Sequence, residues 1–228
     1  MTTRKRRLYF VLLTGAIIIA SFCIFVKESY ASGYSVNNAI KYAHNWSNEH
    51  VSRRGDRYNS SQYLTINDDC TNFVSQCIVA GGKTMTNVRK PSFSLTDYFR
   101  GYKCSYTNKQ WYHKKTKVKK LGKNKTVFYY SSSFSFVGDF YNYWKSQPGC
   151  KTYGDYGSCK RNSNLQKNLQ LGDVIQMYDI GQGWHHTMII TAGKKGDWKF
   201  CSHTTSHKDK PLSDLEAKNR KFRIIRIR

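Results

Sequence analysis

Hydrophobic residues recur at helical spacing in the segment that follows residue 35. Four apolar side chains fall on one face of a helix through this segment: Ala39, Tyr42, Ala43 and Trp46. Ser35 stands just before it, and a serine there accepts a hydrogen bond from a free backbone N–H group of the first turn. The pattern therefore predicts a helix over about residues 36–50.

A second helix is predicted over residues 70–80. Its apolar positions form one stripe, at residues 73, 74, 77 and 78. Asp68 or Asp69 provides an N-cap, and Gly81-Gly82 provides a C-terminal stop. These signals place Cys70 in the first turn of the helix.

The last third of the chain has the pattern of β-strands. Runs of branched and aromatic residues occupy positions 173–178, 186–192, 198–203 and 222–227, with glycine-containing turns at 181–183 and 193–197. Before them, Ser131–Trp144 has helical spacing in its second half. Residues 83–129 are polar, basic and aromatic with weak periodicity, and we expect loops and short elements there. Helices followed by a meander of strands predict an α+β fold.

The first 31 residues have the three parts of a secretory signal. Arg4–Arg7 is a run of four cations, Leu8–Val26 is almost continuously apolar, and Ser29-Tyr30-Ala31 offers small residues two apart. The apolar run also approaches the ~20 residues that span a bilayer as a helix. We therefore expect residues 1–31 to be a signal peptide or signal anchor. Residues 32–228 then form one extracytoplasmic domain, either secreted or anchored to the membrane.

The chain is strongly basic. Its formal net charge is +24, and it is still +20 when residues 1–31 are left out. A charge of this size indicates anionic partners. The cations are densest at Lys114–Lys120, directly after Trp111, Tyr112 and His113, and such a mixture is typical of nucleic-acid-binding surfaces. One hypothesis is therefore a non-catalytic basic module that binds anionic wall polymer or extracellular nucleic acid. An obligate nucleic-acid partner is not expected for an exported domain.

Six of the seven cysteines lie outside the apolar run. Exported proteins commonly pair their cysteines in disulfides. Cys150 and Cys159 bracket an eight-residue segment that contains Gly154 and Gly157. Because such a loop closes easily, we predict a disulfide between these two cysteines.

Cys70 is a candidate nucleophile. The free N–H groups and the dipole at a helix start favour the thiolate, which is the reactive form of cysteine. His186 opens a predicted strand after a glycine-rich turn and is the candidate base, whereas His185 is expected to point to the opposite face. His203, at the end of the following strand, is the candidate third group that orients the base. Taken one at a time, a buried structural cysteine and surface histidines also fit these positions.

The residues around Cys70 also resemble a known family. Asp69-Cys70-Thr71-Asn72-Phe73-Val74-Ser75-Gln76-Cys77, closed by Ala80-Gly81-Gly82, is similar to the signature of the putative amidase domain family, which is related to papain-like and NlpC-type cell-wall peptidases. The likeness covers most of residues 36–215. It continues in order through Tyr42-Ala43, Asn59 with Tyr63, Trp111, Ser133–Phe140, Gly172–Ile175, His186–Thr191 and Ser202-His203-Thr204.

The resemblance implies a papain-like or NlpC-like fold, in which the nucleophile starts a helix that packs on an antiparallel sheet. It implies Cys70 as nucleophile, His186 as base and His203 as third member of the site. It also implies hydrolysis of an amide, with peptidoglycan as the expected substrate and no cofactor. The oxyanion is expected to meet the Cys70 backbone N–H group, with Tyr63 as a second donor.

A zinc site is a weaker alternative. Cys201, His203 and His207 include a His-x₃-His spacing, but no Cys-x-x-Cys pair accompanies it. We therefore expect no metal at the site.

Overall fold

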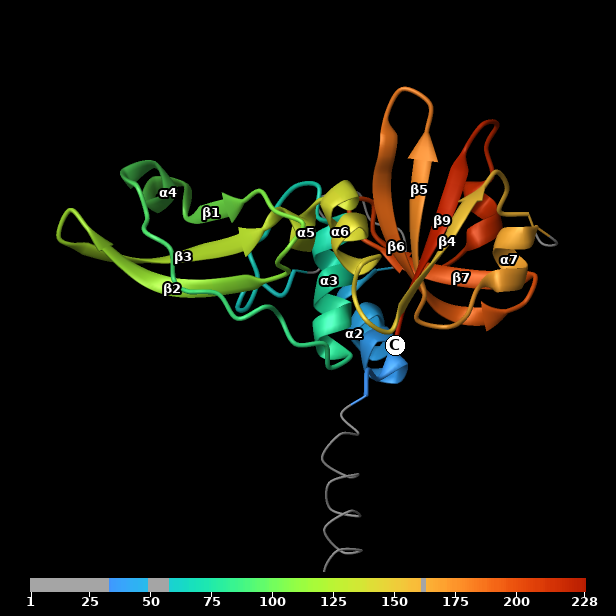
Figure 1. The fold of residues 1–228 in the computed structure, drawn as a ribbon, viewed down its shortest axis with the longest axis horizontal. Helices are drawn as coiled ribbons and strands as arrows, with labels where there is room; N and C mark the ends of the chain where they lie inside the picture. The colour runs from blue at the N-terminus through green and yellow to red at the C-terminus, as the bar shows by residue number, and fades with distance from the viewer. Residues whose placement is uncertain (1–32, 49–57, 161–162) are drawn as a thin grey trace, which may run out of the picture. The chain divides into compact units, whose positions relative to one another are not determined.

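A layer of helices lies between two β-sheets (Figure 1). The computed structural model describes residues 33–48, 58–160 and 163–228. Residues Tyr34–Arg228 form one compact unit. The α+β class predicted from the sequence is confirmed. In the described ranges, no helix is long and apolar enough to cross a membrane. The expected signal segment, residues 1–31, lies outside these ranges.

The larger sheet has six antiparallel strands in the order β4-β9-β5-β6-β7-β8. The strands are Cys150–Tyr156 (β4), Val174–Asp179 (β5), Gly183–Lys194 (β6), Asp197–Ser202 (β7), His207–Pro211 (β8) and Lys221–Ile227 (β9). The four strands predicted from the sequence are present as β5, β6, β7 and β9. The predicted meander is interrupted, because β9 returns to lie between β4 and β5.

Both helices predicted before residue 81 form. Helix α2 spans Val36–Trp46, and the Ser35 hydroxyl accepts a hydrogen bond from the Asn38 N–H group, as a cap does. This helix ends before residue 50, because Ser47 already has extended backbone. Helix α3 spans Cys70–Ala80 and stops at Gly81, followed by Gly82 with φ of 103°, a conformation that suits glycine.

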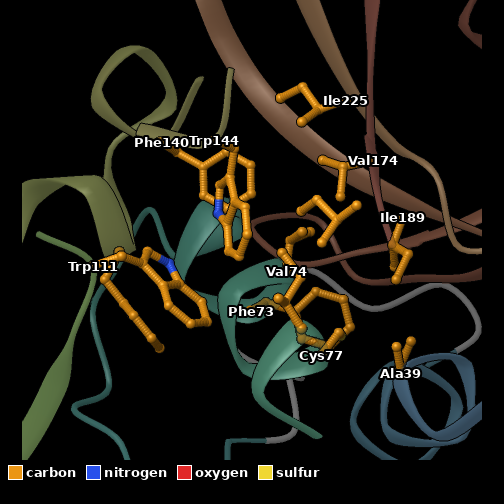
Figure 2. Packing of buried hydrophobic residues seen from close by; sticks show 14 of the residues in the cluster. Ala39, Phe73, Val74, Cys77, Trp111, Phe140, Trp144, Val174, Ile189 and Ile225 are labelled. Carbon is orange, nitrogen blue, oxygen red and sulfur yellow. The ribbon is translucent and has the colours of Figure 1, made fainter. Parts of the chain in front are cut away.

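Helix α3 lies at the centre of the main core (Figure 2). Residues 70–78 are all buried, so the helix has no solvent face along this length. Phe73, Val74 and Cys77 pack with Ala39 of α2 and with Ile189 of β6. On its other side α3 meets aromatic side chains, among them Trp111, Phe134, Phe140 and Trp144. Burial of the whole first turn fixes where the Cys70 side chain lies.

A second core covers the opposite face of the large sheet. Along each strand, its residues alternate with those of the first core. They include Ile175 and Met177 of β5, Met188 and Ile190 of β6, and Phe200 of β7. Helix α7 (Asn164–Asn168) and the 3₁₀ turn η2 (Leu212–Leu215) contribute Leu165 and Leu212 to this core. The two faces of β6 therefore pack against different layers.

The small sheet differs most from what the sequence predicted. It has the strand order β1-β3-β2, with β1 at Tyr102–Ser105, β2 at His113–Lys120 and β3 at Lys123–Ser131, and helix α4 at Leu95–Arg100 precedes it. The expectation of loops and short elements missed the long β2–β3 hairpin. Lysines occupy most outward positions of β2, and Val118 and Val127 are among the few aliphatic side chains that the hairpin buries. Strand periodicity is therefore weak in the sequence.

The helical pattern predicted for Ser131–Trp144 corresponds to two short helices. Helix α5 spans Ser132–Ser135 and α6 spans Val137–Trp144, with Phe136 in extended backbone between them. Phe140 and Trp144 of α6 pack into the core beside α3 (Figure 2).

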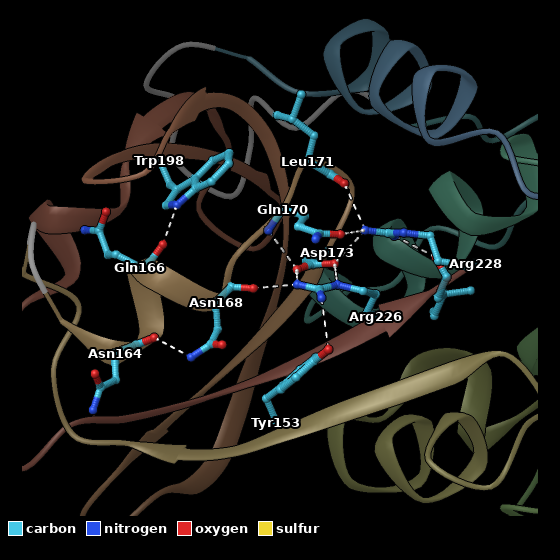
Figure 3. A network of polar contacts seen from close by, with 11 residues as sticks. Tyr153, Asn164, Gln166, Asn168, Gln170, Leu171, Asp173, Trp198, Arg226 and Arg228 are labelled. Carbon is cyan, nitrogen blue, oxygen red and sulfur yellow. Dashed lines mark hydrogen bonds and ion pairs between the residues drawn. The ribbon is translucent and has the colours of Figure 1, made fainter.

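A buried carboxylate holds the C-terminal strand to the turn before β5 (Figure 3). Asp173 is fully buried, and its oxygens accept hydrogen bonds from Arg226 at 3.0 and 2.8 Å and from Arg228 at 3.0 Å. The Gln170 N–H group donates to it at 2.9 Å. Gly172, with φ of 77°, would place a Cβ atom 2.6 Å from Val36, so only glycine fits this close approach. The Gly172-Asp173 pair is therefore structural.

The predicted disulfide between Cys150 and Cys159 is wrong, since both thiols are free. The segment after Cys150 is strand β4, not a loop, and its extended backbone carries the chain away at about 3.3 Å per residue. Cys159 is buried, and its thiol donates to Glu216 at 3.2 Å.

Candidate active site

Cys70 is the first residue of α3 and is 4% exposed. Asp69 occupies the N-cap position, but its side chain makes no capping hydrogen bond. The backbone N–H groups of the first turn, starting with that of Cys70, have no partner within the helix. The positive end of the helix dipole therefore lies at the thiol.

The Cys70 thiol packs against the backbone of β6 on both sides of His186. Its sulfur lies 4.0 Å from the carbonyl oxygen of His185, and the Thr187 backbone N–H group donates to it. The Thr71 hydroxyl lies 3.8 Å from the sulfur. Cys70 and His186, 116 positions apart in the sequence, are thus neighbours through the backbone.

Burial keeps this thiol protonated in the resting protein. Desolvation raises the pKa of Cys70 above its ordinary value of 9.0, and the nearby Asp69 carboxylate raises it further. Hydrogen bonds from Thr187 and Thr71 lower the pKa, but by less than burial raises it. The helix start alone therefore does not supply a thiolate, and the site needs a base.

The polar residues that follow Cys70 hold α3 to its neighbours. The Thr71 and Thr187 hydroxyl oxygens are 2.8 Å apart, which joins α3 to β6. Asn72 Nδ2 donates to Ser135 at 3.3 Å, and Gln76 Nε2 donates to Asn72 Oδ1 at 2.6 Å. All these side chains are buried. Much of the motif around Cys70 thus fixes the position of the helix start.

His203 meets the residue immediately before Cys70. Its Nδ1 lies 2.8 Å from Asp69 Oδ2, and both side chains are almost fully buried. Its Nε2 lies 2.6 Å from the Trp46 carbonyl oxygen at the end of α2. The imidazole also stacks on Phe73, with 4.0 Å between the ring centroids. The sequence predicted His203 as a site residue but gave Asp69 only a capping role. The position of Asp69 directly before Cys70 is the sequence signal for a further role.

These contacts constrain the proton on His203. The Trp46 carbonyl only accepts hydrogen bonds, so Nε2 must donate. The Nδ1–Asp69 contact needs one further proton between them, carried by either the ring or the carboxyl group. Both ring nitrogens of His203 are therefore engaged in hydrogen bonds.

His185 and His186 do not alternate as a regular strand would place them. The register between β5 and β6 shifts at this point, pairing Met177 with His186 and Tyr178 with Trp184, so His185 is an extra residue in a β-bulge. His185 Nδ1 lies 3.0 Å from the Gly183 carbonyl, and its Nε2 lies 3.5 Å from Asp179. His185 is thus held by the β5–β6 turn.

The His186 ring lies toward the face of the sheet away from α3. Thr187 next to it faces α3, and side chains alternate beyond the bulge. The titratable groups that act on the His186 ring are His185, His207 and Arg220. In the described part of the chain, no hydrogen bond joins the His186 ring to Cys70 or to another residue. The structure therefore brings Cys70 to the His186 backbone and not to its ring.

His186 is neutral at physiological pH. Desolvation in its partly buried position, followed by the electrostatic effect of His185, His207 and Arg220, lowers its pKa from 6.5 to about 4. A neutral imidazole is the form that accepts a proton.

Tyr63 lies in the main core. It is 7% exposed and packs against His113 and Phe134, with centroid distances of 5.2 and 6.0 Å. Burial raises the pKa of Tyr63 to about 12. No hydrogen bond between its hydroxyl and Cys70 is found among the described residues.

A cavity of about 410 Å³ opens beside the loop that leads to Cys70. One wall is residues 66–68, and the other walls come from α4, β1 and the aromatic side chains Tyr106, Tyr130 and Phe136. Asp97, Arg100 and Lys103 give it charges of both signs. The cavity can therefore accept a polar chain with apolar segments.

Comparison with known proteins gives one match. The sequence model of the family described as the putative amidase domain matches residues 33–225, which is most of the chain. No curated protein and no solved structure shows a significant similarity to this chain.

Proposed function

The chain belongs to the putative amidase domain family, and on that basis we propose that it is a cysteine-dependent amidohydrolase with Cys70 as its nucleophile. Family membership indicates amide hydrolysis. The observation that supports cysteine dependence is the position of the Cys70 thiol at a buried helix start, against the β6 backbone that flanks a neutral histidine.

The proposed reaction is acyl transfer in two steps. The Cys70 sulfur attacks the amide carbonyl carbon while its proton passes to the base, and the base then protonates the departing amine. A thioester remains on Cys70. Water then attacks the thioester with the base taking its proton, which releases the acid and restores the thiol. The Cys70 backbone N–H group stabilises the oxyanion in both steps.

We propose His186 as the base, acting from a resting state in which both partners are neutral. The pKa of the Cys70 thiol is raised above its ordinary value, whereas the His186 pKa is lowered to about 4, so the proton rests on the sulfur. Moving the proton to the histidine before attack is therefore unfavourable. Proton transfer coupled to attack on the substrate avoids most of this cost.

Catalysis through His186 also requires its ring to turn toward α3. The β-bulge at His185 allows this rotation. If the bulge moves by one residue along β6, the His186 side chain passes from one face of the sheet to the other. His203, held by Asp69, is the positioning member beside the nucleophile. We do not assign an oxyanion role to Tyr63, whose ring is enclosed by core aromatics.

We propose peptidoglycan as the substrate and the outside of the cytoplasmic membrane as the location. The support is the export pattern of residues 1–31 and the strongly basic charge of the chain, which suits an anionic cell wall. The cavity beside residues 66–68 offers a path for a peptide to Cys70.

The β2–β3 hairpin supports a second function, binding of anionic wall polymer. Lys115, Lys117 and Lys119 are exposed at alternate positions of β2, so their side chains project from one face of the hairpin. Such a row attracts polyanions in a salt-dependent way. Replacing all three by Gln should weaken polymer binding at low salt and leave turnover on short peptides unchanged.

The experiment that tests the enzyme proposal is digestion of peptidoglycan followed by mass spectrometry. The full chain, purified in detergent, should release fragments with a new carboxylate and a new amine, and Cys70→Ala should release none. Wild-type turnover by Cys70→Ala would refute a cysteine mechanism. Binding of wall polymer without any fragment release would favour the non-catalytic function.

A further inference from the structure

Three potential metal ligands from separate elements meet outside the Cys70 site. They are His44 in the last turn of α2, Cys201 in β7 and Asp209 in β8. One ligand atom from each lies within 4.8 Å of the others. His44 and Asp209 are about a third exposed, at 31% and 33%, whereas Cys201 is fully buried. The cluster therefore opens to solvent on one side only.

The contacts around this cluster already orient its donor atoms. His44 Nε2 lies 2.9 Å from Asp209 Oδ1, and the Thr191 hydroxyl donates to the same oxygen at 2.6 Å. The Cys201 sulfur lies 3.4 Å from the Thr191 hydroxyl, and the Asp209 backbone N–H group also hydrogen-bonds to it. Asp209 holds a left-handed backbone with φ of 51°, which is uncommon outside glycine. The backbone thus departs from strand geometry at the residue that brings the carboxylate to the sulfur.

We propose that His44, Cys201 and Asp209 bind one Zn²⁺ ion, with water as the fourth ligand. Imidazole, thiolate and carboxylate are the side-chain ligands that zinc takes in proteins. Binding forms the Zn–S bond and releases the thiol proton to solvent, while the His44 imidazole and the Asp209 carboxylate donate lone pairs. One thiolate and one carboxylate balance the charge of the ion.

The geometry is close to what zinc needs. Tetrahedral zinc with bonds of about 2.0–2.3 Å sets its ligand atoms about 3.3–3.8 Å apart. The three donors lie within 4.8 Å, so shifts of about 1 Å close the site. Thr191 then serves as the outer partner that orients the Asp209 carboxylate.

The ion would be structural and separate from the amide chemistry. Zinc at this point joins the end of α2 to β7 and β8. The same end of α2 carries the Trp46 carbonyl that holds His203. The weaker zinc alternative drawn from the sequence comprised Cys201, His203 and His207, and only Cys201 is common to that set and to this cluster.

The test is metal binding by the full chain, purified in detergent. Every protein tested carries Cys70→Ser, so that the Cys70 thiol cannot bind the metal, and the chain with this change alone is called the background protein. Co²⁺ should bind at one equivalent with sulfur-to-cobalt charge-transfer absorption, and Zn²⁺ should displace it. Cys201→Ser should lose this absorption, and His44→Ala and Asp209→Asn should each weaken binding at least about tenfold. Cys104→Ser, at another free thiol, is the matched control and should bind as the background does.

Thermal unfolding provides a second readout that does not depend on the colour of cobalt. Zn²⁺ should raise the Tm of the background protein and of Cys104→Ser, but not that of His44→Ala or Asp209→Asn, because only an intact site binds the folded state. His44 and Asp209 are partly exposed, so these variants are expected to fold. Unchanged cobalt absorption in Cys201→Ser, or no bound metal in the background protein, would overturn the proposal.

Discussion

Asp69 and His203 lie 134 positions apart in the sequence and meet through a 2.8 Å contact in which both side chains are almost fully buried. One side chain precedes the nucleophile, and the other stacks on Phe73 one helical turn later. The contact therefore joins the start of α3 to the end of β7. It explains why Asp69 does not cap its own helix, since its carboxylate is directed to the histidine.

Asp69→Asn tests whether this contact serves catalysis. The amide keeps the size of the side chain but replaces the carboxylate of the Asp69–His203 contact with a neutral group. We expect kcat to fall roughly 10²-fold or more, with a smaller change in KM, because the positioning of Cys70 is lost rather than substrate binding. Steady-state kinetics on one peptidoglycan fragment measure this. Asp155→Asn, at an exposed position on β4, is the control. Equal losses in both variants would exclude a specific role for Asp69.

The two cysteines of α3 should separate chemistry from packing. Cys70→Ala is expected to abolish hydrolysis with little loss of fold, because it removes the proposed nucleophile. Cys77 is fully buried in the core between α2, α3 and β6. Cys77→Ala should therefore lower the free energy of unfolding by ~1–3 kcal/mol. Turnover and denaturant unfolding measured on both variants give the comparison. A Cys77→Ala protein that is as stable as wild type would show that this core position tolerates a cavity.

His185 and His186 should differ strongly when each is changed to Ala. Loss of the base typically costs ~10²–10⁴-fold in rate, so His186→Ala should remove nearly all turnover. His185 is held by the Gly183 carbonyl and Asp179, so its loss should loosen the β5–β6 turn and cost much less. The kcat/KM values of the two variants on one wall peptide decide the assignment. A larger loss at residue 185 would mean that the strand presents the other histidine to the nucleophile.

The pH profile tests the protonation states of the proposed pair. The pKa of His186 is lowered to about 4, so the imidazole is neutral and able to accept a proton at any higher pH. The kcat/KM value should therefore rise with pH through about 4 and then stay level, instead of rising near the ordinary histidine pKa of about 6.5. Protein returned from the lowest pH to neutrality controls for unfolding. An acid limb near pH 6.5 would assign the base to a more exposed histidine.

The sequence predicted those elements whose burial leaves a periodic pattern. Helix α3 was recognised because its apolar stripe is bounded by aspartates and glycines, and β5, β6, β7 and β9 because branched residues are clustered in them. The β2–β3 hairpin was missed because its outward positions are lysines. The orientation of His186 depends on the bulge at His185, and a one-residue change of register has no local sequence signal here. The Asp69–His203 contact joins distant segments, so the position of Asp69 next to Cys70 signals a role at the site but not its partner.

The buried Asp173 should be more important for stability than for catalysis. Its carboxylate binds the guanidinium groups of Arg226 and Arg228, and its side chain has no exposure to solvent (Figure 3). Asp173→Ala leaves both cations without this partner. Because the Arg226 and Arg228 side chains are 13% and 34% exposed, the loss should be smaller than the about 3–5 kcal/mol for breaking a fully buried ion pair. We therefore expect the midpoint of urea unfolding to drop markedly, while kcat/KM of the folded fraction stays near wild type. Asp155→Ala should leave the midpoint unchanged, because that side chain is exposed. Similar midpoints for the two variants would show that β9 is held by its strand pairing with β4 and β5 and by core packing rather than by Asp173.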